Sequence, residues 1–522
     1  MGTTGNRVVV IGAGIAGLVT AKVLRADGFE VLVFEKEPQF GGVWIESRTY
    51  PGLRTNNSRD TYAFSDHPYP ESADTFPAAA QVRAYLASYA ERFGLVECIR
   101  LSTEVVRVER AEDGFEIDLL GPDGPETVRS DFVVVCSGVF SEPQLPVIDG
   151  ADRFDGVLVH SSQATDPALF TGRRVVVVGA GKSALDCAAW AGARAETCTL
   201  VFRKPYYMAP RYLPGGAPFD RFVGRGGELF LPYHHMDRLE RFLHGPGAPV
   251  TRLFWQILSF WARTLLRMPR ILVPDRPLPH GIENAGVGQD FYDMARLGRI
   301  RLRRDTIAGF TGGDGIRLAG GDRIDADVIV FATGWRQSAP FLTPELHSAV
   351  QTDGRYRLYR HILAPTEQRL GFIGFASSVA CQLSAEISAH WLSQSFRGEL
   401  GVPPLEDMLA EIARVAAWLG EVMPGRPEGY FIGPYLSHHI DDLMRDMGLP
   451  TRRTGNLLTE YLGVLLPGRY RGITEERSRV REGLAPQRSS QGSSVAQAVG
   501  ALAVLGSAYA LIRHFMRGSA AK

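Results

Sequence analysis

The glycines Gly12, Gly14 and Gly17 have the GxGxxG spacing of a turn that binds a dinucleotide. In such a turn the first glycine permits a sharp change of direction, and the second lets the backbone approach a pyrophosphate. The third glycine lets the following helix pack closely on the preceding strand. The pyrophosphate then meets free N–H groups at the positive end of that helix. We therefore predict that these glycines bind the phosphates of a dinucleotide.

An acidic residue, Glu35, comes 23 positions after Gly12, at the end of an apolar run. A carboxylate at this point can accept hydrogen bonds from both ribose hydroxyls, and it would repel a 2′-phosphate. The first site is thus predicted to take FAD or NAD rather than NADP. Lys36, which follows directly in the sequence, is assigned to the same site.

A second turn of this kind begins at Gly179 and continues through Gly181. Ala184 stands in the third glycine position, where only close packing is needed. The intervening residues Lys182 and Ser183 are assigned to the same phosphate site.

A basic pair, Arg203 and Lys204, lies where the first unit has its acid, 24 positions after Gly179. A guanidinium can pair bidentately with a phosphate, so Arg203 suits the 2′-phosphate of NADPH, and Lys204 adds a second charge. The alternative is an exposed surface pair without a ligand. Two sites of opposite charge preference imply one flavin, one reduced nicotinamide and hydride transfer between them.

Apolar runs rich in β-branched residues precede both turns, and they are typical of strands buried on both faces of a parallel sheet. A stretch of helical composition follows each turn, and similar apolar runs recur along the chain. The sequence therefore predicts an α/β fold with two dinucleotide-binding, Rossmann-like domains. The expected strands span residues 7–11, 31–34, 132–136, 173–178, 198–202 and 328–331.

Composition narrows the function classes. A chain of 522 residues exceeds the usual size of one hydrophobic core, so at least two domains are expected. Lys plus Arg and Asp plus Glu both number 57, so the chain has no excess of positive charge that would favour binding to nucleic acid. The five cysteines have no CxxC or metal-ligand spacing, so we predict no metal site, disulfide framework or redox dithiol.

The stretch 205–299 breaks the α/β rhythm, because it is rich in aromatic residues and in Pro and Gly turns. It also contains an apolar segment from Leu253 to Leu266 that is interrupted by Arg263. We interpret this stretch as a substrate-side insertion with its own helices. Contact of the apolar segment with a membrane is the alternative.

The C-terminal region has a different character. Residues 485–494 form a linker rich in Ser, Gln and Gly, and residues 495–512 form eighteen positions without a charge. Basic residues follow, which favours a membrane-anchor helix at 495–513 over a packed core helix. No apolar signal segment opens the chain, so we expect a cytoplasmic body with a C-terminal helical tail, anchored by residues 495–512.

Several ordered segments between about Arg7 and Pro450 together resemble the flavin-containing monooxygenases, class B flavoproteins that are related to Baeyer–Villiger monooxygenases. Gly41-Gly42-Val43-Trp44 looks like the family's GGxW flavin segment. Thr55-Asn56-Asn57-Ser58, followed by FSDHP at 64–68, is similar to its TN.S…FSDFP stretch. Phe331-Ala332-Thr333-Gly334-Trp335 matches its FATGY motif, with Trp in place of Tyr.

Two departures from the family pattern bear on the substrate. The FxGxxxHxxx(Y/F) fingerprint is present from Phe154 to His160, but its last position is Ala164. Lys182 replaces the asparagine of the usual GxGNSG. The Baeyer–Villiger form of the fingerprint wants Trp-Pro or Asp after its histidine segment, and residues 161–164 offer neither. Heteroatom oxygenation is therefore favoured, with His160 as a hinge and fingerprint residue rather than a proton shuttle.

The resemblance implies a mechanism in which NADPH reduces FAD and O₂ adds to the flavin to give a C4a-hydroperoxide. A soft nucleophile of a small organic substrate, an amine nitrogen or a sulfur, then takes the distal oxygen, as in an N,N-dimethylaniline monooxygenase. Asn56 aligns with the family asparagine that hydrogen-bonds the hydroperoxide region, and the alternative for it is a turn residue. The resemblance also assigns further FAD-binding residues, namely Gly42, Val43, Trp44, Val105, Thr333 and Gly334.

Three other functions stay open from the sequence: oxygenation of a ketone, an NADPH oxidase-like activity, and a non-catalytic flavoprotein. The expected FAD-binding domain comprises residues 1–165 and 325–450, and the NADPH-binding domain of residues 166–324 is inserted in it. Residues 451–494 are expected to form a C-terminal extension and linker. The insertion that would shape the substrate pocket has no readable signature.

Overall fold

Two five-stranded sheets, each with only parallel pairings, organise the chain. The structure is a computed structural model that describes residues 5–486, apart from 51, 214, 223, 281–288 and 424–430. The first sheet has the order β20 (Leu370–Phe372), β7 (Phe132–Val135), β1 (Arg7–Ile11), β2 (Glu30–Phe34) and β3 (Ile99–Arg100). Its central strands are the predicted β-branched runs, and their side chains are buried on both faces because helices or other strands cover each side.

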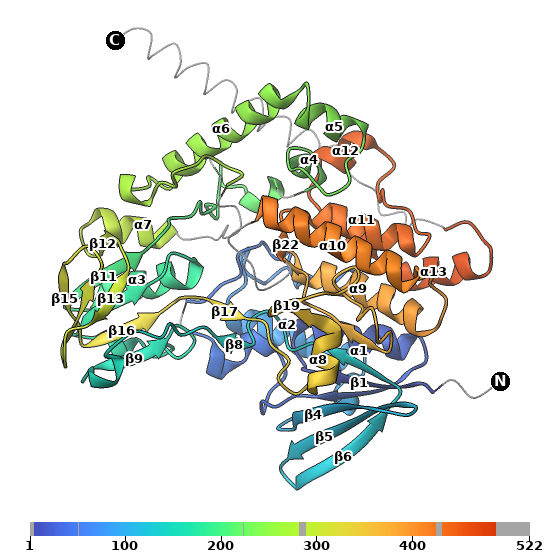
Figure 1. Ribbon diagram of the computed structural model, residues 1–522. Helices are drawn as coiled ribbons and strands as arrows, with labels where there is room; N and C mark the ends of the chain where they lie inside the picture. Colours follow the sequence, from blue (N-terminus) through green and yellow to red (C-terminus); the bar gives the residue numbers. More distant parts are fainter. Residues whose placement is uncertain are drawn as a thin grey trace.

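The second sheet has the order β12 (Arg301–Arg304), β11 (Thr197–Phe202), β10 (Arg174–Val178), β16 (Val328–Phe331) and β9 (Val157–His160). Figure 1 shows the two sheets on different sides of the molecule, each with its own helices. The predicted α/β fold with parallel sheets is thus confirmed.

Two strands near the predicted domain boundaries pair within the second sheet. Val157 of β9 lies opposite Val328 of β16, and Val175 of β10 lies opposite the same residue, so β9 and β16 belong to the second sheet. The predicted boundaries at 165/166 and 324/325, which assign the residues of both strands to the FAD-binding domain, stay a prediction. A strand that is buried on both faces has the same apolar pattern whichever neighbour it joins, so the sequence pattern does not reveal its partners.

Antiparallel strands extend each unit. A meander of β4 (Glu104–Ala111), β5 (Gly114–Gly121) and β6 (Gly124–Ser130) packs beneath the first sheet. A smaller one contains β13 (Ile307–Phe310), β14 (Gly315–Leu318) and β15 (Arg323–Asp325). The two units are linked by the pair β8 (Glu142–Pro143) and β17 (Trp335–Arg336). Other short strands are β18 (Gln351–Thr352), β19 (Arg355–Tyr356), β21 (Ser377–Ser378) and β22 (Phe431–Gly433).

Helices cover both sheets. α1 (Ile15–Ala26) packs against α9 (Cys381–Phe396), which is buried along nearly its whole length. α9 in turn contacts α11 (Leu436–Asp446), and α3 (Lys182–Arg194) packs against α7 (Gln289–Arg296) in the second unit. Further helices are α2 (Ala79–Arg92), α8 (Pro344–Val350) and α10 (Leu405–Val422).

The predicted insertion forms helices of its own, α4 (Arg225–Glu228), α5 (Arg238–His244) and α6 (Ala248–Leu265). Its buried aromatic residues pack on α10 and on the start of α11, so the insertion is joined to the C-terminal helices. α6 runs along the outer side of the molecule (Figure 1), and Leu253 and Phe260 on it are exposed. Among the described residues, no helix is both long and apolar enough to cross a membrane.

The chain after residue 450 packs on the body through α12 (Leu457–Leu462) and α13 (Ile473–Arg481). Arg453 and Glu476 form an ion pair in which both side chains are almost fully buried, and Ile473 joins the core of the first unit. Breaking a buried pair leaves an uncompensated charge, so this pair holds α13 against the stretch before α12, while Ile473 ties α13 to the body. The predicted anchor at 495–513 lies outside the described residues.

Candidate active site

The first glycine-rich turn connects β1 to α1 and leaves the start of the helix open. Gly12 has a φ of +101°, and a Cβ on it would lie 2.8 Å from the carbonyl oxygen of Cys136. A Cβ on Gly17 would lie 1.9 Å from the carbonyl oxygen of Gly12. The N-cap residue is Gly14, so no side chain caps the helix, and its first turn contains no acidic residue. Free N–H groups at this positive helix end suit a pyrophosphate.

The GGxW segment crosses this turn as the short helix η1 (Gly42–Trp44). A Cβ on Gly42 would lie 3.1 Å from the Cα atom of Gly14, so only two glycines let the two backbones meet this closely. Trp44 is buried, and its indole N–H donates to the hydroxyl of Tyr62 at 3.0 Å, while Val43 is half-buried beside it. The cradle between the two segments fits a cofactor that needs close backbone approach, as a flavin dinucleotide does.

Glu35 lies at the end of β2 with only 7% of its surface exposed. Its Oε2 accepts the backbone N–H of Ala13 at 2.8 Å, and its Oε1 accepts that of Glu37 at 3.1 Å. These bonds hold the carboxylate beside the glycine turn, where remaining lone pairs suit ribose hydroxyls. Lys36 is exposed next to it, and Val105 lies in the core beneath β1 and β2. The FAD contacts of Lys36 and Val105 stay predictions.

The second glycine-rich turn connects β10 to α3. Gly179 has a φ of +135°, and a Cβ on it would lie 2.3 Å from the carbonyl oxygen of Ala332. Gly181 is the N-cap residue, no side chain caps the helix, and no atom lies within 4 Å of a Cβ placed there. Ser183 is exposed in the first turn, whereas Ala184 is fully buried against the strand. This turn also presents free N–H groups to an anion.

Arg203 and Lys204 follow β11 at the carboxyl end of the second sheet, and both are exposed. On the neighbouring strand β12, Arg304 donates to the carbonyl oxygen of Arg203 at 3.4 Å and forms an ion pair with Asp275. Among the described residues, no carboxylate forms an ion pair with Arg203. Its guanidinium can therefore take a phosphate.

Thr333 and Gly334 follow β16 and lie at the link between the two sheets. The carbonyl oxygen of Gly334 accepts the N–H of Gln144 and the Nε2–H of His160, both at 3.0 Å. The hydroxyl of Thr333 donates to the carbonyl oxygen of Gln144. Ala332, which precedes them, lies against Gly179, so both residues lie beside the second glycine turn as well as near the first unit. Their predicted FAD contacts stay predictions.

His160 is 1% exposed, and burial lowers its pKa. Its Nε2 donates to Gly334, so its Nδ1 accepts the backbone N–H of Ser162 at 3.2 Å. A neutral imidazole held at both nitrogens fits the expected hinge role, because neither nitrogen is available to move a proton.

Asn56 lies in a turn whose other residues are buried. Thr55, Asn57 and Ser58 are exposed by 1%, 7% and 3%, whereas Asn56 is exposed. The hydroxyl of Thr55 donates to the carbonyl oxygen of Asn57 at 2.7 Å, which closes the turn. The amide of Asn56 is thus the polar group that this turn presents outward. Its catalytic role stays a prediction.

Comparison with known proteins decides the family. The model of a flavin-binding monooxygenase-like family matches residues 5–242 and 287–423. The chain belongs to this family. A probable flavin-containing monooxygenase 1 of Arabidopsis thaliana is 28% identical, over 91% of this chain and 98% of the relative. An N-oxide-forming dimethylaniline monooxygenase 4 of Mus musculus is 27% identical, over 78% of this chain and 73% of the relative.

Solved structures share the fold of this flavin-dependent monooxygenase. The S-allyl-L-cysteine S-oxygenase of Allium sativum has a TM-score of 0.62 and 21% identity, over 96% of this chain and 98% of the other. An oxidized steroid monooxygenase bound to NADP has a TM-score of 0.63 and 22% identity, over 85% and 97%.

The two units of the monooxygenase are also joined by a hydrogen bond that sequence reasoning missed. Asp186 on α3 accepts the hydroxyl of Tyr50 and pairs with Lys182, and the ring of Tyr50 lies edge-on to Trp190 with centroids 4.8 Å apart. Burial and the charge of Asp186 raise the pKa of Tyr50. Lys182, which replaces the family asparagine, is therefore held by Asp186 of its own helix, and Tyr50 of the first unit contacts the same carboxylate. Only the spacing of Lys182 and Asp186, i to i+4 on a helix, was visible in the sequence.

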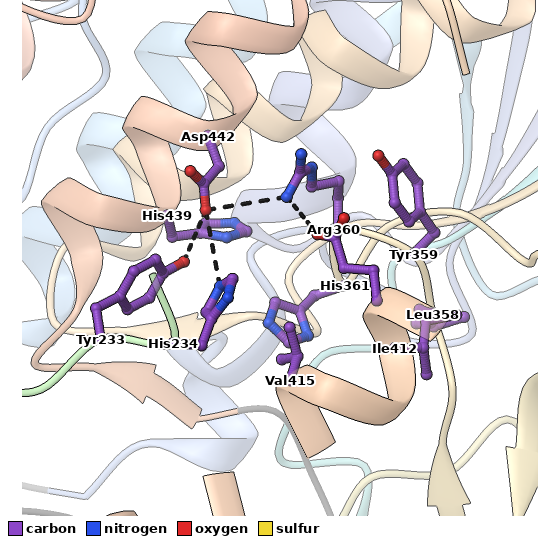
Figure 2. A pocket seen from close by; sticks show the side chains of 11 residues that line it. Tyr233, His234, Leu358, Tyr359, Arg360, His361, Ile412, Val415, His439 and Asp442 are labelled. Carbon is purple, nitrogen blue, oxygen red and sulfur yellow. Dashed lines mark hydrogen bonds and ion pairs between the residues drawn. The ribbon is translucent and has the colours of Figure 1, made fainter. Parts of the chain in front are cut away.

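A second polar cluster lies away from both glycine turns, around a cavity of about 20 Å³ (Figure 2). His234, His361 and His439 line it, and burial lowers the pKa of each, to about 3 for His234 and His439. Such a volume holds about one water molecule. Because their pKa values are lowered, the three imidazoles are neutral at pH 7.

Three groups of this cluster, His234, His235 and Asp442, have ligand atoms within 4.8 Å of one another, as a metal site would. However, Asp442 already accepts the hydroxyl of Tyr233 at 2.9 Å and pairs with Arg445. Guanidinium groups beside the carboxylate oppose a cation. We therefore interpret the cluster as an ion-pair network that joins the insertion to α11. The paired histidines and aspartates at 234–235 and 438–442 were its sequence signal.

Proposed function

We propose that this chain is an NADPH- and FAD-dependent monooxygenase that oxygenates a soft nucleophile, an amine nitrogen or a sulfur, of a small organic substrate. The observation that carries this proposal is the contrast between two otherwise similar open helix ends. Glu35 lies beside the helix end at the first glycine turn. Arg203 and Lys204 lie at the end of the strand next to the second glycine turn. The first pattern suits a ribose without a 2′-phosphate and the second suits a 2′-phosphate.

FAD would lie on the first turn, with its pyrophosphate at the start of α1 and its ribose at Glu35. Gly14 and Gly42 give the backbone approach that it needs, since a Cβ added to Gly42 would lie only 3.1 Å from the Cα atom of Gly14. When bound and reduced by NADPH, the flavin supplies the activation of O₂. The chain's own residues bind, orient and exclude water.

NADPH would lie on the second turn, with its pyrophosphate at the start of α3 and Lys182 beside it. Arg203 and Lys204 would bind the 2′-phosphate, because both are exposed and a guanidinium can bind two phosphate oxygens. His160 and Gly334 would keep the link between the two units in place, since their hydrogen bond joins β9 to the segment after β16.

Asn56 would act beside the flavin, where its amide can donate to an oxygen atom and accept from a neighbouring donor. The turn that carries it is tied to the flavin segment, because Tyr62 follows this turn and accepts the indole N–H of Trp44. A buried turn with one exposed amide is suited to hold a donor in a fixed position.

The substrate class rests on two kinds of support. The mouse relative is named for N-oxide formation and the Allium sativum protein for S-oxygenation, and both acceptors are soft nucleophiles. Residues 161–164 also offer neither the Trp-Pro nor the Asp of the Baeyer–Villiger fingerprint, and Ala164 is buried. Oxygenation of a ketone is the second candidate, since a steroid monooxygenase shares the fold.

The test is NADPH oxidation by the purified, FAD-loaded protein with tertiary amines, sulfides and cyclic ketones, followed by product mass. An amine oxide or a sulfoxide that is about 16 mass units heavier supports the proposal, whereas a lactone from the ketone favours the second candidate. NADPH consumption that yields only hydrogen peroxide with every substrate would indicate an oxidase. Bound FAD without NADPH consumption would indicate a non-catalytic flavoprotein.

A further inference from the structure

A carboxylate of the insertion lies buried beneath the turn that carries Asn56. Asp220, in η6 (Phe219–Phe222), is 4% exposed. Its Oδ2 accepts both the backbone N–H and the hydroxyl of Ser58 at 2.7 Å, and it also accepts the hydroxyl of Thr61. One carboxylate oxygen thus takes three donors of a turn that lies about 160 residues earlier in the chain.

These donors fix the turn directly after Asn56. The carbonyl oxygen of Ser58 accepts the N–H of Thr61 at 3.1 Å, so both ends of this short loop are tied to Asp220. Thr61 also accepts the side-chain amide of Asn57 at 3.4 Å. Since charge-assisted hydrogen bonds to a carboxylate are stronger than neutral ones, Asp220 ties the insertion firmly to this turn.

The second oxygen of Asp220 takes no part in holding the loop. Its Oδ1 is buried and has no hydrogen-bond partner among the described residues. An unpaired buried carboxylate oxygen costs free energy, and such groups in folded proteins are concentrated where function keeps them. A carboxylate selected only to close this turn would be replaced at lower cost by a smaller acceptor.

We propose that Asp220 is a positioning residue, which sets the place of the Asn56 amide through Ser58 and Thr61. This inference rests on the proposed function, because it takes Asn56 as the group that acts beside the flavin. The proposal gives the insertion a defined role, because Asp220 of the insertion holds the turn that carries Asn56. A change in the insertion is thereby transmitted to Asn56.

The first readout does not depend on activity. Hydrogen–deuterium exchange of the peptide that spans residues 52–63 reports the backbone N–H of Ser58, with and without FAD. Asp220→Ala should raise exchange in this peptide by about tenfold, and Asp220→Asn, which keeps an acceptor oxygen, should raise it by only about threefold. Asp237→Ala is the matched control, because Asp237 accepts the N–H of Glu240 as the N-cap of α5 in the same insertion. It should leave this peptide unchanged.

The second readout is a double-mutant cycle on coupling, measured as oxygenated product formed per NADPH consumed. Asp220→Ala and Asn56→Ala should each lower this ratio by about tenfold or more, with flavin reduction by NADPH within a few-fold of wild type. If Asp220 acts through Asn56, the double variant should be no worse than Asn56→Ala alone. Asp220→Asn should recover most of the coupling.

Three outcomes would overturn the inference. They are normal coupling in Asp220→Ala, effects of the two substitutions that multiply in the double variant, and unchanged exchange at 52–63. If Asp220→Ala does not fold, a loss of coupling in Asp220→Asn that multiplies with Asn56→Ala would overturn it as well. If the wild-type protein makes no oxygenated product with any substrate, that result contradicts the proposed function and not the role of Asp220. The exchange experiment then still decides whether Asp220 holds the turn.

Discussion

The Cβ position of Gly42 lies 3.1 Å from the Cα atom of Gly14, so the GGxW segment and the first glycine turn meet backbone to backbone. Gly42 also has a φ of +60°, which an L-residue adopts only with strain. Gly42→Ala should therefore push the two segments apart and weaken FAD binding by about tenfold or more, together with a loss of about 1 kcal/mol in stability. Fluorescence titration of the apoprotein with FAD measures the first effect.

Gly28→Ala is the matched control for this substitution. Gly28 has a φ of +92°, but nothing lies within 4 Å of a Cβ placed there. It should lose similar stability through backbone strain and keep its FAD affinity. Equal loss of FAD affinity in both variants would show that strain alone, and not the contact with Gly14, is responsible.

Arg203→Ala should raise the Michaelis constant for NADPH and leave that for NADH nearly unchanged. Loss of a charge-assisted bidentate pair costs about 1.5–3 kcal/mol, or roughly ten- to a hundredfold. Steady-state kinetics with both nucleotides measures the difference. Arg301→Ala, an exposed arginine on the neighbouring strand β12, should change neither constant. If both nucleotides weaken equally in Arg203→Ala, Arg203 does not bind the 2′-phosphate.

The elements around the glycine turns could be predicted because their signals are local. The apolar run before Gly12 and the one before Gly179 form strands at the expected positions, and each turn opens a helix. Sequence pattern also placed an acid at one site and a base at the other. These features need only short-range spacing and the chemistry of single side chains.

The remaining features depend on contacts between distant segments. β16 pairs with β9 and β10 although its apolar pattern fits either sheet, so the sequence alone did not reveal which sheet it joins. Asp220 accepts a hydrogen bond from Ser58, about 160 residues away in the chain, and no spacing in the sequence predicts such a contact. The insertion follows no repeated pattern, so its packing on α10 and α11 became visible only in the fold.

Asn56→Asp should separate the two half-reactions. The substitution keeps the shape of the side chain but removes the donor and adds a negative charge beside a centre where charge develops. We expect FAD to stay bound and NADPH-driven flavin reduction to stay within a few-fold. Product formation should fall by about a hundredfold, as for one lost preorganised donor. Stopped-flow absorbance and product mass measure the two steps. Normal product formation would show that Asn56 is only a turn residue.

Removal of residues 490–522 should release the protein from membranes while flavin stays bound. Residues 495–512 are uncharged and basic residues follow them, which is the composition expected of an anchor. Sedimentation with a membrane fraction and the flavin absorbance of the soluble protein measure the two effects. Equal sedimentation of the full-length and shortened chains would contradict an anchor.

His438 joins the insertion to α11 through two carboxylates. Its Nδ1 lies 2.8 Å from Glu228 Oε2, and its Nε2 lies 2.5 Å from Glu240 Oε1. Burial alone would lower the pKa of His438, but the hydrogen bonds and charges of the two carboxylates outweigh it and raise the pKa to about 10. The imidazole is therefore charged in the folded protein at neutral pH, whereas it titrates near 6.5 in an unfolded chain.

This shift makes the stability of the insertion depend on pH. Because the folded pKa is the higher one, the contribution of His438 is fully present below about pH 6.5 and is lost as the pH rises toward about 10. His438→Gln should lower the melting temperature at pH 6 and flatten its fall between pH 7 and 10. His244→Gln is the control, because His244 lies in the same insertion and, among the described residues, its imidazole hydrogen-bonds only the carbonyl oxygen of Leu229. It should keep the wild-type slope. A wild-type melting temperature that is constant from pH 6 to 10 would show that His438 is not a charged link between the two carboxylates.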